Sequence, residues 1–332
     1  MDEKNMIAPR KSTGKLKRST YGDWIIVAVM ILLIITCILP ILSVVAVGLS
    51  DPRAVNRREV TFLPLRMELV DSNTGALLDP ETDAGVAGAV WRPRLGFQTE
   101  AFGNVLTDNR FMRSLAWTAV LTLIVVVMNL AMTVLCAYPL TYESLKGRKI
   151  LTVFVIFTMY FGAGLIPTFI LFRDLRLLNN PLVLILPGMI SVFFMVIMRN
   201  FFMGIPESLK ESAEIDGAGP MYTLVKIILP LSKPVLATVG LFYAVGRWNG
   251  FMDGLFFLPG AQDWHPIQLL LYNIMQGITS VDVNDPGDVT VPGMGPAMES
   301  AAIVIATIPI LCVYPFAQKY FVKGATLGAV KG

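Results

Sequence analysis

Charge is scarce in this chain, and that scarcity excludes most soluble proteins. Only 15% of the 332 residues are charged, while 55% are hydrophobic and the mean hydropathy is +0.64. Soluble domains carry roughly 25% charged residues. The composition therefore predicts a membrane protein, in which a net charge of +3 is an orientation signal rather than a nucleic-acid surface.

Cysteine and histidine are also too few for a disulfide framework or a metal centre. Cys37, Cys136 and Cys312 each lie inside an apolar run, where we expect them to be small buried hydrophobes. The one histidine, His265, has no second ligand candidate and is expected at the surface. No nucleophile with a base and an orienting group stands out, and the phosphate-loop pattern G-x-x-x-x-G-K-[ST] is missing. We therefore expect no catalytic site, no metal and no bound ATP on this chain.

Long apolar runs, in contrast, are abundant. An α-helix needs about 20 mostly apolar residues to cross the hydrocarbon core of a bilayer. The runs predict an all-α membrane protein with six transmembrane helices, the first of which is too long for a signal peptide. Their expected bounds are Trp24–Leu49, Ser114–Tyr138, Ile150–Phe172, Leu182–Phe202, Pro234–Leu258 and Ser300–Phe321.

Lysines set the expected orientation, because Lys and Arg are retained on the cytoplasmic side. They lie before the first run, between the second and third, between the fourth and fifth, and after the sixth, which places both termini in the cytoplasm. We expect a basic cytoplasmic tail over 1–23, a transmembrane domain over 24–322 and a second cytoplasmic tail over 323–332. A long outer loop covers 51–113, and the last outer loop, 259–299, contains no Lys or Arg.

A polar segment at 206–233 separates two apolar runs on the cytoplasmic side. Pro206 followed by acidic residues suits the start of a helix, where N–H groups are unpaired and the dipole is positive. Gly-Ala-Gly at 217–219 breaks that helix, and Pro220 opens a second amphipathic stretch that we expect Leu-Pro at 229–230 to end. The pattern predicts a helix-turn-helix at the membrane surface, either an interfacial linker or a docking site.

A motif within this segment favours docking. An acidic residue, two small residues, a glycine four positions later and a distant Ile-x-Leu-Pro resemble the EAA loop of ABC importer membrane subunits. In that family the loop docks in a cleft of a dimeric ATPase, so the resemblance implies that ATP and Mg²⁺ are bound by partner subunits. Serine replaces the family's commoner alanine at one position, and both residues are small. The residues assigned to ATPase coupling in this way are Glu211, Ser212, Ala213, Asp216, Gly217, Ile227, Leu229 and Pro230.

The resemblance extends over most of the chain, to carbohydrate-importer permeases of the maltose-transporter second-subunit type. Within them it is nearest to a branch serving oligosaccharides of complex polysaccharides. It implies a type I ABC importer permease fold, inward movement of oligosaccharide, a second permease, an ATPase dimer and an extracytoplasmic solute-binding protein. Matching stretches include "AYPLTYESLKGRK" (137–149), "LILPGMISVFFMVIMRNFF" (184–202), "LPLSKPVLATVGLFYAVGRWN" (229–249) and "YFVKGATLGAVKG" (320–332).

The chain departs from that family over 65–94, a segment that typical relatives lack. Two short apolar stretches flank a turn-rich Ser-Asn-Thr-Gly sequence at 72–75, a pattern that predicts a β-hairpin on the outer side. The insert either contacts the solute-binding protein or is a tolerated loop extension, because long loops accept insertions at little entropic cost.

Polar residues inside apolar runs mark the expected substrate route, since they are costly in lipid and usually face a cavity. Arg247 draws most attention, because no acid lies one turn away on its own helix. Its partner is expected from another helix, the second permease or an acidic solute, or it is held by backbone carbonyls. The candidates for the route are Asn129, Tyr160, Tyr243, Arg247, Trp248 and Asn249.

Two functions fit these observations. The first is the permease subunit of an oligosaccharide importer. The second is a non-transporting membrane receptor or scaffold, which uses the segment at 206–233 to bind a cytoplasmic protein. Polar residues inside the fifth run favour the transporter.

Overall fold

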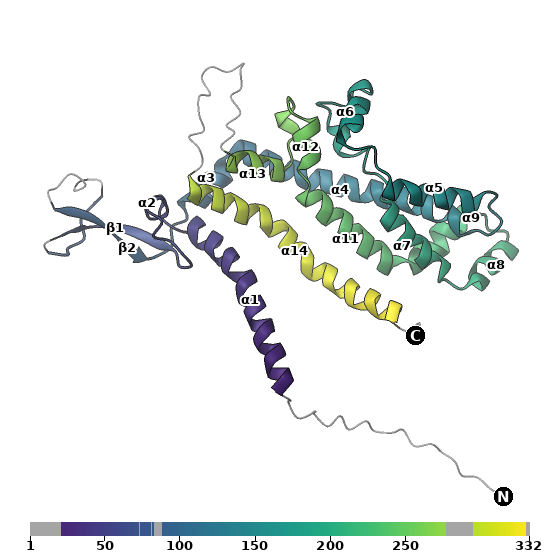
Figure 1. Cartoon of the computed structure of the whole chain (residues 1–332), viewed down its shortest axis with the longest axis horizontal. Helices are drawn as coiled ribbons and strands as arrows, with labels where there is room; N and C mark the ends of the chain where they lie inside the picture. The colour runs from purple at the N-terminus through teal and green to yellow at the C-terminus, as the bar shows by residue number, and fades with distance from the viewer. Residues whose placement is uncertain (1–20, 73, 81, 83–87, 277–294, 330–332) are drawn as a thin grey trace, which may run out of the picture.

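The computed structural model describes residues 21–329, except 73, 81, 83–87 and 277–294. Most of the expected tail over 1–23, the end of the tail over 323–332 and part of the last outer loop lie outside the described residues. The rest forms an elongated helical body with a small β-hairpin at one end of its long axis (Figure 1).

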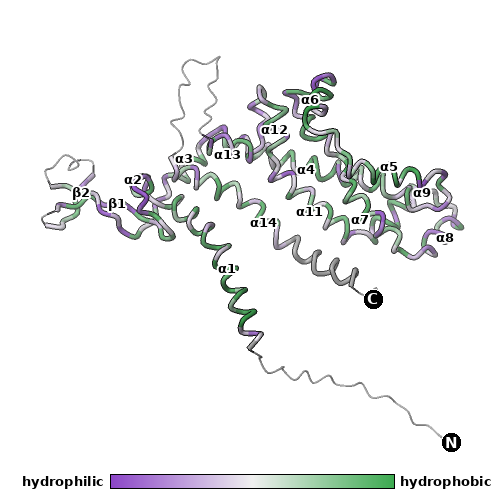
Figure 2. The backbone as a smooth tube through the Cα atoms, viewed as in Figure 1, coloured by the Kyte–Doolittle hydropathy of each residue, from purple (hydrophilic) through white to green (hydrophobic). Residues whose placement is uncertain are grey.

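Three long helices carry the most apolar sequence. They are α1 (Tyr21–Gly48), α4 (Asn109–Ala137) and α14 (Pro296–Ala329). Each is long and apolar enough to cross a membrane, and the number rises to six if three bent helix pairs each count as one span. Figure 2 shows hydrophobic residues along most of α1 and α4. A helical membrane protein is therefore confirmed, and six spans with both ends in the cytoplasm stays a prediction.

Runs three, four and five are interrupted rather than single straight helices. The third is split into α5 and α6, which meet at 110°, because Gly164 adopts a left-handed φ of +83° after a Phe-Gly-Ala sequence. The fourth is helical only after a non-helical stretch with Pro187 and Gly188, and the fifth stops before Gly250. The resulting elements are α5 (Arg148–Tyr160), α6 (Leu165–Asp174), η2 (Pro181–Leu184), α7 (Val192–Met203), α11 (Lys233–Asn249) and α12 (Met252–Phe257).

Helix α4 lies at the centre of the packing. It contacts α11 and α7 along its length, while α14 packs on α1, on α11 and on the short helix α3. Asn129 and Thr133 on α4, and Tyr138 directly after it, are buried. The core beside them is built from Met195, Met198, Phe202, Ile228 and Val239. The remaining short elements near α4 are α3 (Glu100–Thr107), η1 (Pro139–Thr141), η4 (Gln262–Trp264) and α13 (Ile267–Met275).

Two cysteines and the histidine differ from expectation. Cys37 and Cys312 are exposed in this single chain, because their helices have one face without a neighbour, and Cys136 is half-buried. His265 is also partly buried rather than freely exposed, and its Nε2 lies 2.9 Å from the backbone oxygen of Leu258.

A β-hairpin in this insert is confirmed, but its second strand is 89–95 rather than the stretch directly after 72–75, which adds only an isolated bridge between Val70 and Leu77. Strands β1 (Leu65–Asp71) and β2 (Ala89–Leu95) pair antiparallel, and helix α2 (Pro52–Asn56) packs against β1. The fold is therefore not purely α-helical. The hairpin lies at the opposite end of the molecule from helices α8 and α9 (Figure 1).

The predicted helix-turn-helix is also present, with a later end than expected. Pro230 occupies the first turn of a helix, where a missing N–H is tolerated, so the chain stays helical through Leu231. It then bends by 83° at Ser232 into α11. The elements are α8 (Glu207–Ile215), α9 (Pro220–Thr223), a π-helical turn η3 (Leu224–Ile228) and α10 (Leu229–Leu231).

Candidate functional site

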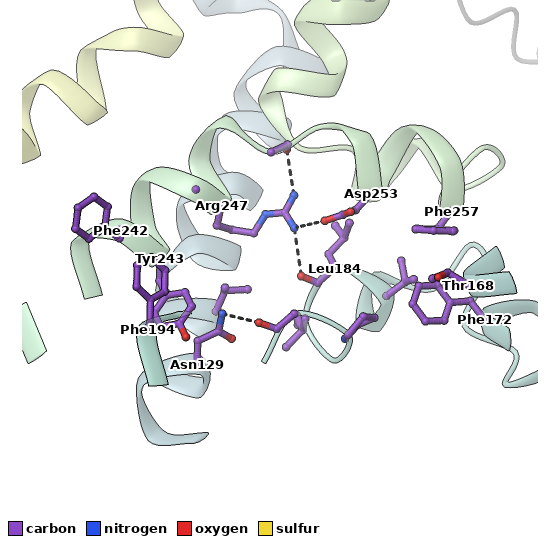
Figure 3. Close-up of a pocket in the computed structure, with 17 residues that line it drawn as sticks. Asn129, Thr168, Phe172, Leu184, Phe194, Phe242, Tyr243, Arg247, Asp253 and Phe257 are labelled. Carbon is purple, nitrogen blue, oxygen red and sulfur yellow. Dashed lines mark hydrogen bonds and ion pairs between the residues drawn. The ribbon is translucent and has the colours of Figure 1, made fainter. Parts of the chain in front are cut away.

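A cavity of about 420 Å³ lies where the broken helices meet α4. Its walls come from α4, α6, α7, α11, α12 and the non-helical stretch before α7 (Figure 3). The position of the cavity is explained by the breaks in the helices. Non-helical backbone at membrane depth is tolerated only where it is buried in protein or lines a water-filled cavity. The polar lining is Asn129, Thr168, Tyr243, Arg247 and Asp253, and the aromatic lining is Phe172, Phe194, Phe242 and Phe257.

Asn129 projects from α4 to the non-helical stretch. Its side chain is buried, with the residue 4% exposed, and Nδ2 donates a hydrogen bond of 3.0 Å to the carbonyl of Gly188. Among the described residues no group donates to Oδ1. Asn129 therefore satisfies one carbonyl that the broken helix leaves free and keeps one acceptor at the cavity wall.

Arg247 is buried near the end of α11 and joins three segments. One terminal nitrogen donates to the carbonyl of Leu184 at 3.3 Å and lies 3.3 Å from a carboxylate oxygen of Asp253. The other donates to the carbonyl of Gly250 at 3.0 Å, and Nε has no partner among the described residues. The turn at Gly250 brings Asp253, on α12, back toward α11, so both an acid and carbonyls hold the guanidinium.

Tyr243 ties three elements together one turn before Arg247. Its hydroxyl lies 2.7 Å from Thr133 Oγ1 on α4 and accepts a hydrogen bond of 3.3 Å from the N–H of Ser191. That N–H precedes α7, so the tyrosine joins α4, α7 and α11 at the edge of the cavity.

The other three route candidates lie elsewhere. Tyr160 is 72% exposed at the end of α5, and Asn249 is exposed at the end of α11. Trp248 is buried and donates from Nε1 to the carbonyl of Ala306 at 3.2 Å, which fastens α11 to α14. Asp253 and the four aromatic residues of the cavity were missed, because phenylalanines inside apolar runs look like any core residue.

The motif glycine of the surface loop forms the turn after α8. Gly217 has φ +79°, and its N–H and that of Ala218 bond to the carbonyls of Glu214 and Ala213 at 3.0 and 2.8 Å. This is a Schellman cap, which requires a left-handed residue and therefore favours glycine. A Cβ built on Gly217 would meet nothing within 4 Å, so the space beyond it is open.

The remaining loop residues divide between two faces. Glu211, Ser212 and Asp216 are exposed, whereas Ala213 is only 6% exposed and faces the protein's own core. Ile227 and Leu229 are half-buried and Pro230 is exposed. Apolar side chains also stand in the open beside the turn, namely Ile215, Met221, Tyr222 and Val225.

Helix α8 is connected to the end of α4 through aromatic side chains. The ammonium of Lys210 lies 5.8 Å from the ring centre of Tyr142, whose hydroxyl hydrogen-bonds that of Tyr138. Tyr138 packs edge-on against Phe202 of α7, with ring centres 6.3 Å apart. Lys210 on α8 is thus linked through Tyr142 and Tyr138 to α7, one of the helices that line the cavity.

Residues 130–326 match the family model described as binding-protein-dependent transport system inner membrane component. The chain belongs to this family. It is 35% identical, over 93% of its length and 98% of the relative, to the polygalacturonan/rhamnogalacturonan transport system permease protein YtcP of Bacillus subtilis. It is 41% identical to protein LplC of the same organism, over 71% of this chain and 80% of that protein.

A solved structure supports the same assignment. The chain is similar to a component of a bacterial ABC transporter involved in the import of the acidic polysaccharide alginate, with a TM-score of 0.72 and 30% identity. The match covers 92% of this chain and 99% of that one. The resemblance to carbohydrate ABC importer permeases is confirmed, as are the type I importer fold and the membrane location. The chain is a transport subunit rather than an enzyme, and the receptor or scaffold alternative is not favoured.

Proposed function

We propose that this permease moves acidic oligosaccharides, released from uronic-acid polysaccharides, through the cavity between α4, α7 and α11. The support for an acidic solute comes from relatives. YtcP is named for polygalacturonan and rhamnogalacturonan, and the structural neighbour belongs to an importer of the acidic polysaccharide alginate.

The lining of the cavity supports a sugar as the solute. Sugar rings present C–H faces and many hydroxyls, so they suit sites that combine aromatic faces with a few fixed hydrogen-bonding groups. Phe194, Phe242 and Phe257 supply aromatic surface, and Asn129 Oδ1 supplies an acceptor for a hydroxyl. Arg247 has a structural role in the cavity wall rather than a role in binding the sugar. Two backbone carbonyls and Asp253 already hold its terminal nitrogens.

Transport on this proposal depends on partner subunits. ATP and Mg²⁺ are bound by a dimeric ATPase that contacts the exposed side of α8 and the turn at Gly217. A second permease completes the pathway, and an extracytoplasmic solute-binding protein delivers the sugar. Exposed Ile215 and Met221 beside that turn support this assignment, since large apolar side chains in the open mark an interaction site.

The test is uptake by the complete transporter in proteoliposomes. We expect oligogalacturonate to be taken up in preference to neutral arabino-oligosaccharide. Asn129→Ala should raise the half-saturating oligogalacturonate concentration about fivefold, the loss of one hydrogen bond of about 1 kcal/mol. Thr122→Ala is the matched control, because Thr122 lies on the same helix and does not line the cavity.

The acidic solute and the role of Asn129 are contradicted by different results. Preferential uptake of the neutral sugar would overturn the acidic solute. Equal half-saturating concentrations for Asn129→Ala and Thr122→Ala would remove Asn129 from the route.

A further inference from the structure

The register of the β-hairpin gathers arginines on one of its faces. Directly opposed residues in an antiparallel pair point to the same side of the sheet. Arg66 is paired with Arg94, and Glu68 is paired with Arg92, so three arginines surround one glutamate. We call these residues, Arg66, Glu68, Arg92 and Arg94, the arginine face.

The other face of the hairpin is already covered. Met67 and Leu69 point to that side and are 4% and 2% exposed. Arg53 of α2 lies over the ring of Trp91, 4.0 Å from its centre, so α2 closes this side. On the arginine face, in contrast, Arg66, Arg92 and Arg94 are all exposed.

The charges on the arginine face are not balanced by other described residues of the chain. Glu68 pairs with Arg94 at 3.2 Å, and within the described part of the chain Arg66 and Arg92 have no carboxylate partner. Arg66 and Arg94 are moreover like charges directly across from each other, an arrangement that destabilises a hairpin. An acidic partner relieves this repulsion.

The hairpin presents this face rigidly and resists strand addition. Two backbone hydrogen bonds join its base to the segment that follows α1. The N–H of Asp51 donates to the carbonyl of Leu65 at 2.9 Å, and the N–H of Gln98 donates to the carbonyl of Leu49 at 2.8 Å. Pro93 removes a donor from β2, which protects an edge strand against pairing with another strand. A partner is therefore engaged by side chains.

The geometry points to an acidic surface of the extracytoplasmic solute-binding protein as the occupant of the arginine face. The family depends on such a protein, and the hairpin lies at the end of the molecule remote from the ATPase-facing helices α8 and α9 (Figure 1). Complementary charge speeds and orients docking more than it tightens the final complex. This inference rests on the importer assignment and does not depend on which sugar is carried.

The test is the kinetics of solute-binding protein association with the complete transporter in lipid nanodiscs. Arg66→Gln with Arg92→Gln should lower kon about tenfold at low salt and flatten its dependence on ionic strength, with koff little changed. Arg57→Gln with Arg58→Gln is the control, because it removes two arginines from the neighbouring α2 segment. We expect that control to change kon less than twofold, because Arg57 and Arg58 do not belong to the arginine face.

Three results would overturn the inference. One is an unchanged kon in the arginine-face variant, and another is an equal fall in both variants. The third is loss of oligogalacturonate or anionic-vesicle binding by the arginine-face variant while docking of the binding protein stays normal.

Uptake of oligogalacturonate at saturating binding protein should persist in the variant, which separates this test from that of the solute. Unfolding temperature serves as the folding check and should not fall, because Arg66→Gln removes a like-charge contact.

Discussion

Arg247 and Asp253 form an ion pair of 3.3 Å across the break between α11 and α12. The arginine side chain is 6% exposed and the aspartate 58% exposed, so the pair joins a buried cation to a counterion at the cavity mouth. The same guanidinium holds the carbonyls of Leu184 and Gly250. It therefore fixes the position of the chain where two spans are interrupted.

Arg247→Gln should impair the transporter without regard to the sugar. Glutamine cannot reach both carbonyls, so we expect a loss of about 2–4 kcal/mol in stability, from two charge-assisted hydrogen bonds. Uptake of acidic and neutral oligosaccharides should fall in equal proportion, measured in proteoliposomes alongside a thermal melt in detergent. Selective loss of the acidic sugar at unchanged stability would instead make Arg247 a ligand of the solute.

Two substitutions of Gly217 test whether the turn after α8 contacts the ATPase. One keeps the backbone conformation of the turn, and the other adds a large side chain at the proposed contact. Asparagine tolerates the left-handed conformation, so Gly217→Asn should keep the turn and leave uptake within about twofold of wild type. Gly217→Trp should abolish uptake and ATPase stimulation, because its side chain enters space that is open in this chain and that we assign to the ATPase. Solute capture by the binding protein should stay intact, and normal uptake by the tryptophan variant would contradict the assignment.

Tyr243 and Thr133 should be energetically coupled. Their hydroxyls lie 2.7 Å apart in a buried position, so Tyr243→Phe and Thr133→Val should each cost about 1 kcal/mol. The double variant should cost less than the sum, with a coupling of about 0.5–1.5 kcal/mol. Denaturant titration of the four proteins in one detergent measures this, and strict additivity would show that the contact contributes nothing.

Gly48 is expected to set the distance between α1 and α14. A Cβ at this position would lie 3.1 Å from the backbone nitrogen of Ala301, which cannot move aside as a side-chain end can. Gly48→Val should therefore destabilise the protein by about 1–3 kcal/mol. Gly22→Val on the same helix is the control, because its Cβ would meet nothing within 4 Å. Equal melting temperatures for the two variants would contradict close helix packing here.

Much of this fold could be predicted locally. Apolar runs located α1, α4 and α14, since the requirement to satisfy backbone groups in lipid makes a long apolar run helical. The turn-rich sequence at 72–75 indicated a hairpin in the insert, although the second strand lies further along the chain. The glycine at 217 predicted the turn after α8, because local φ and ψ preferences decide that turn. The EAA-like spacing likewise indicated the family before any contact was known.

The cavity was decided by tertiary structure. The apolar runs 150–172, 182–202 and 234–258 are each interrupted, and side chains from α4 and α11 satisfy free carbonyls beside the interruption in 182–202. Asn129 reaches Gly188 and Arg247 reaches Leu184, contacts separated by 59 and 63 positions that no local pattern reveals. Arg247's acid partner was missed for the same reason, since the turn at Gly250, rather than helical spacing, brings Asp253 near.

The arginine face depends on both the amino-acid sequence and the tertiary structure. The sequence by itself indicated a hairpin around the turn at 72–75, since strand and turn propensities act over a few positions. Only strand register and the docking of α2 decided that Arg66, Arg92 and Arg94 share the open side while Met67 and Leu69 are buried. The physical reason is that a shift of one residue in register would move every side chain to the opposite face.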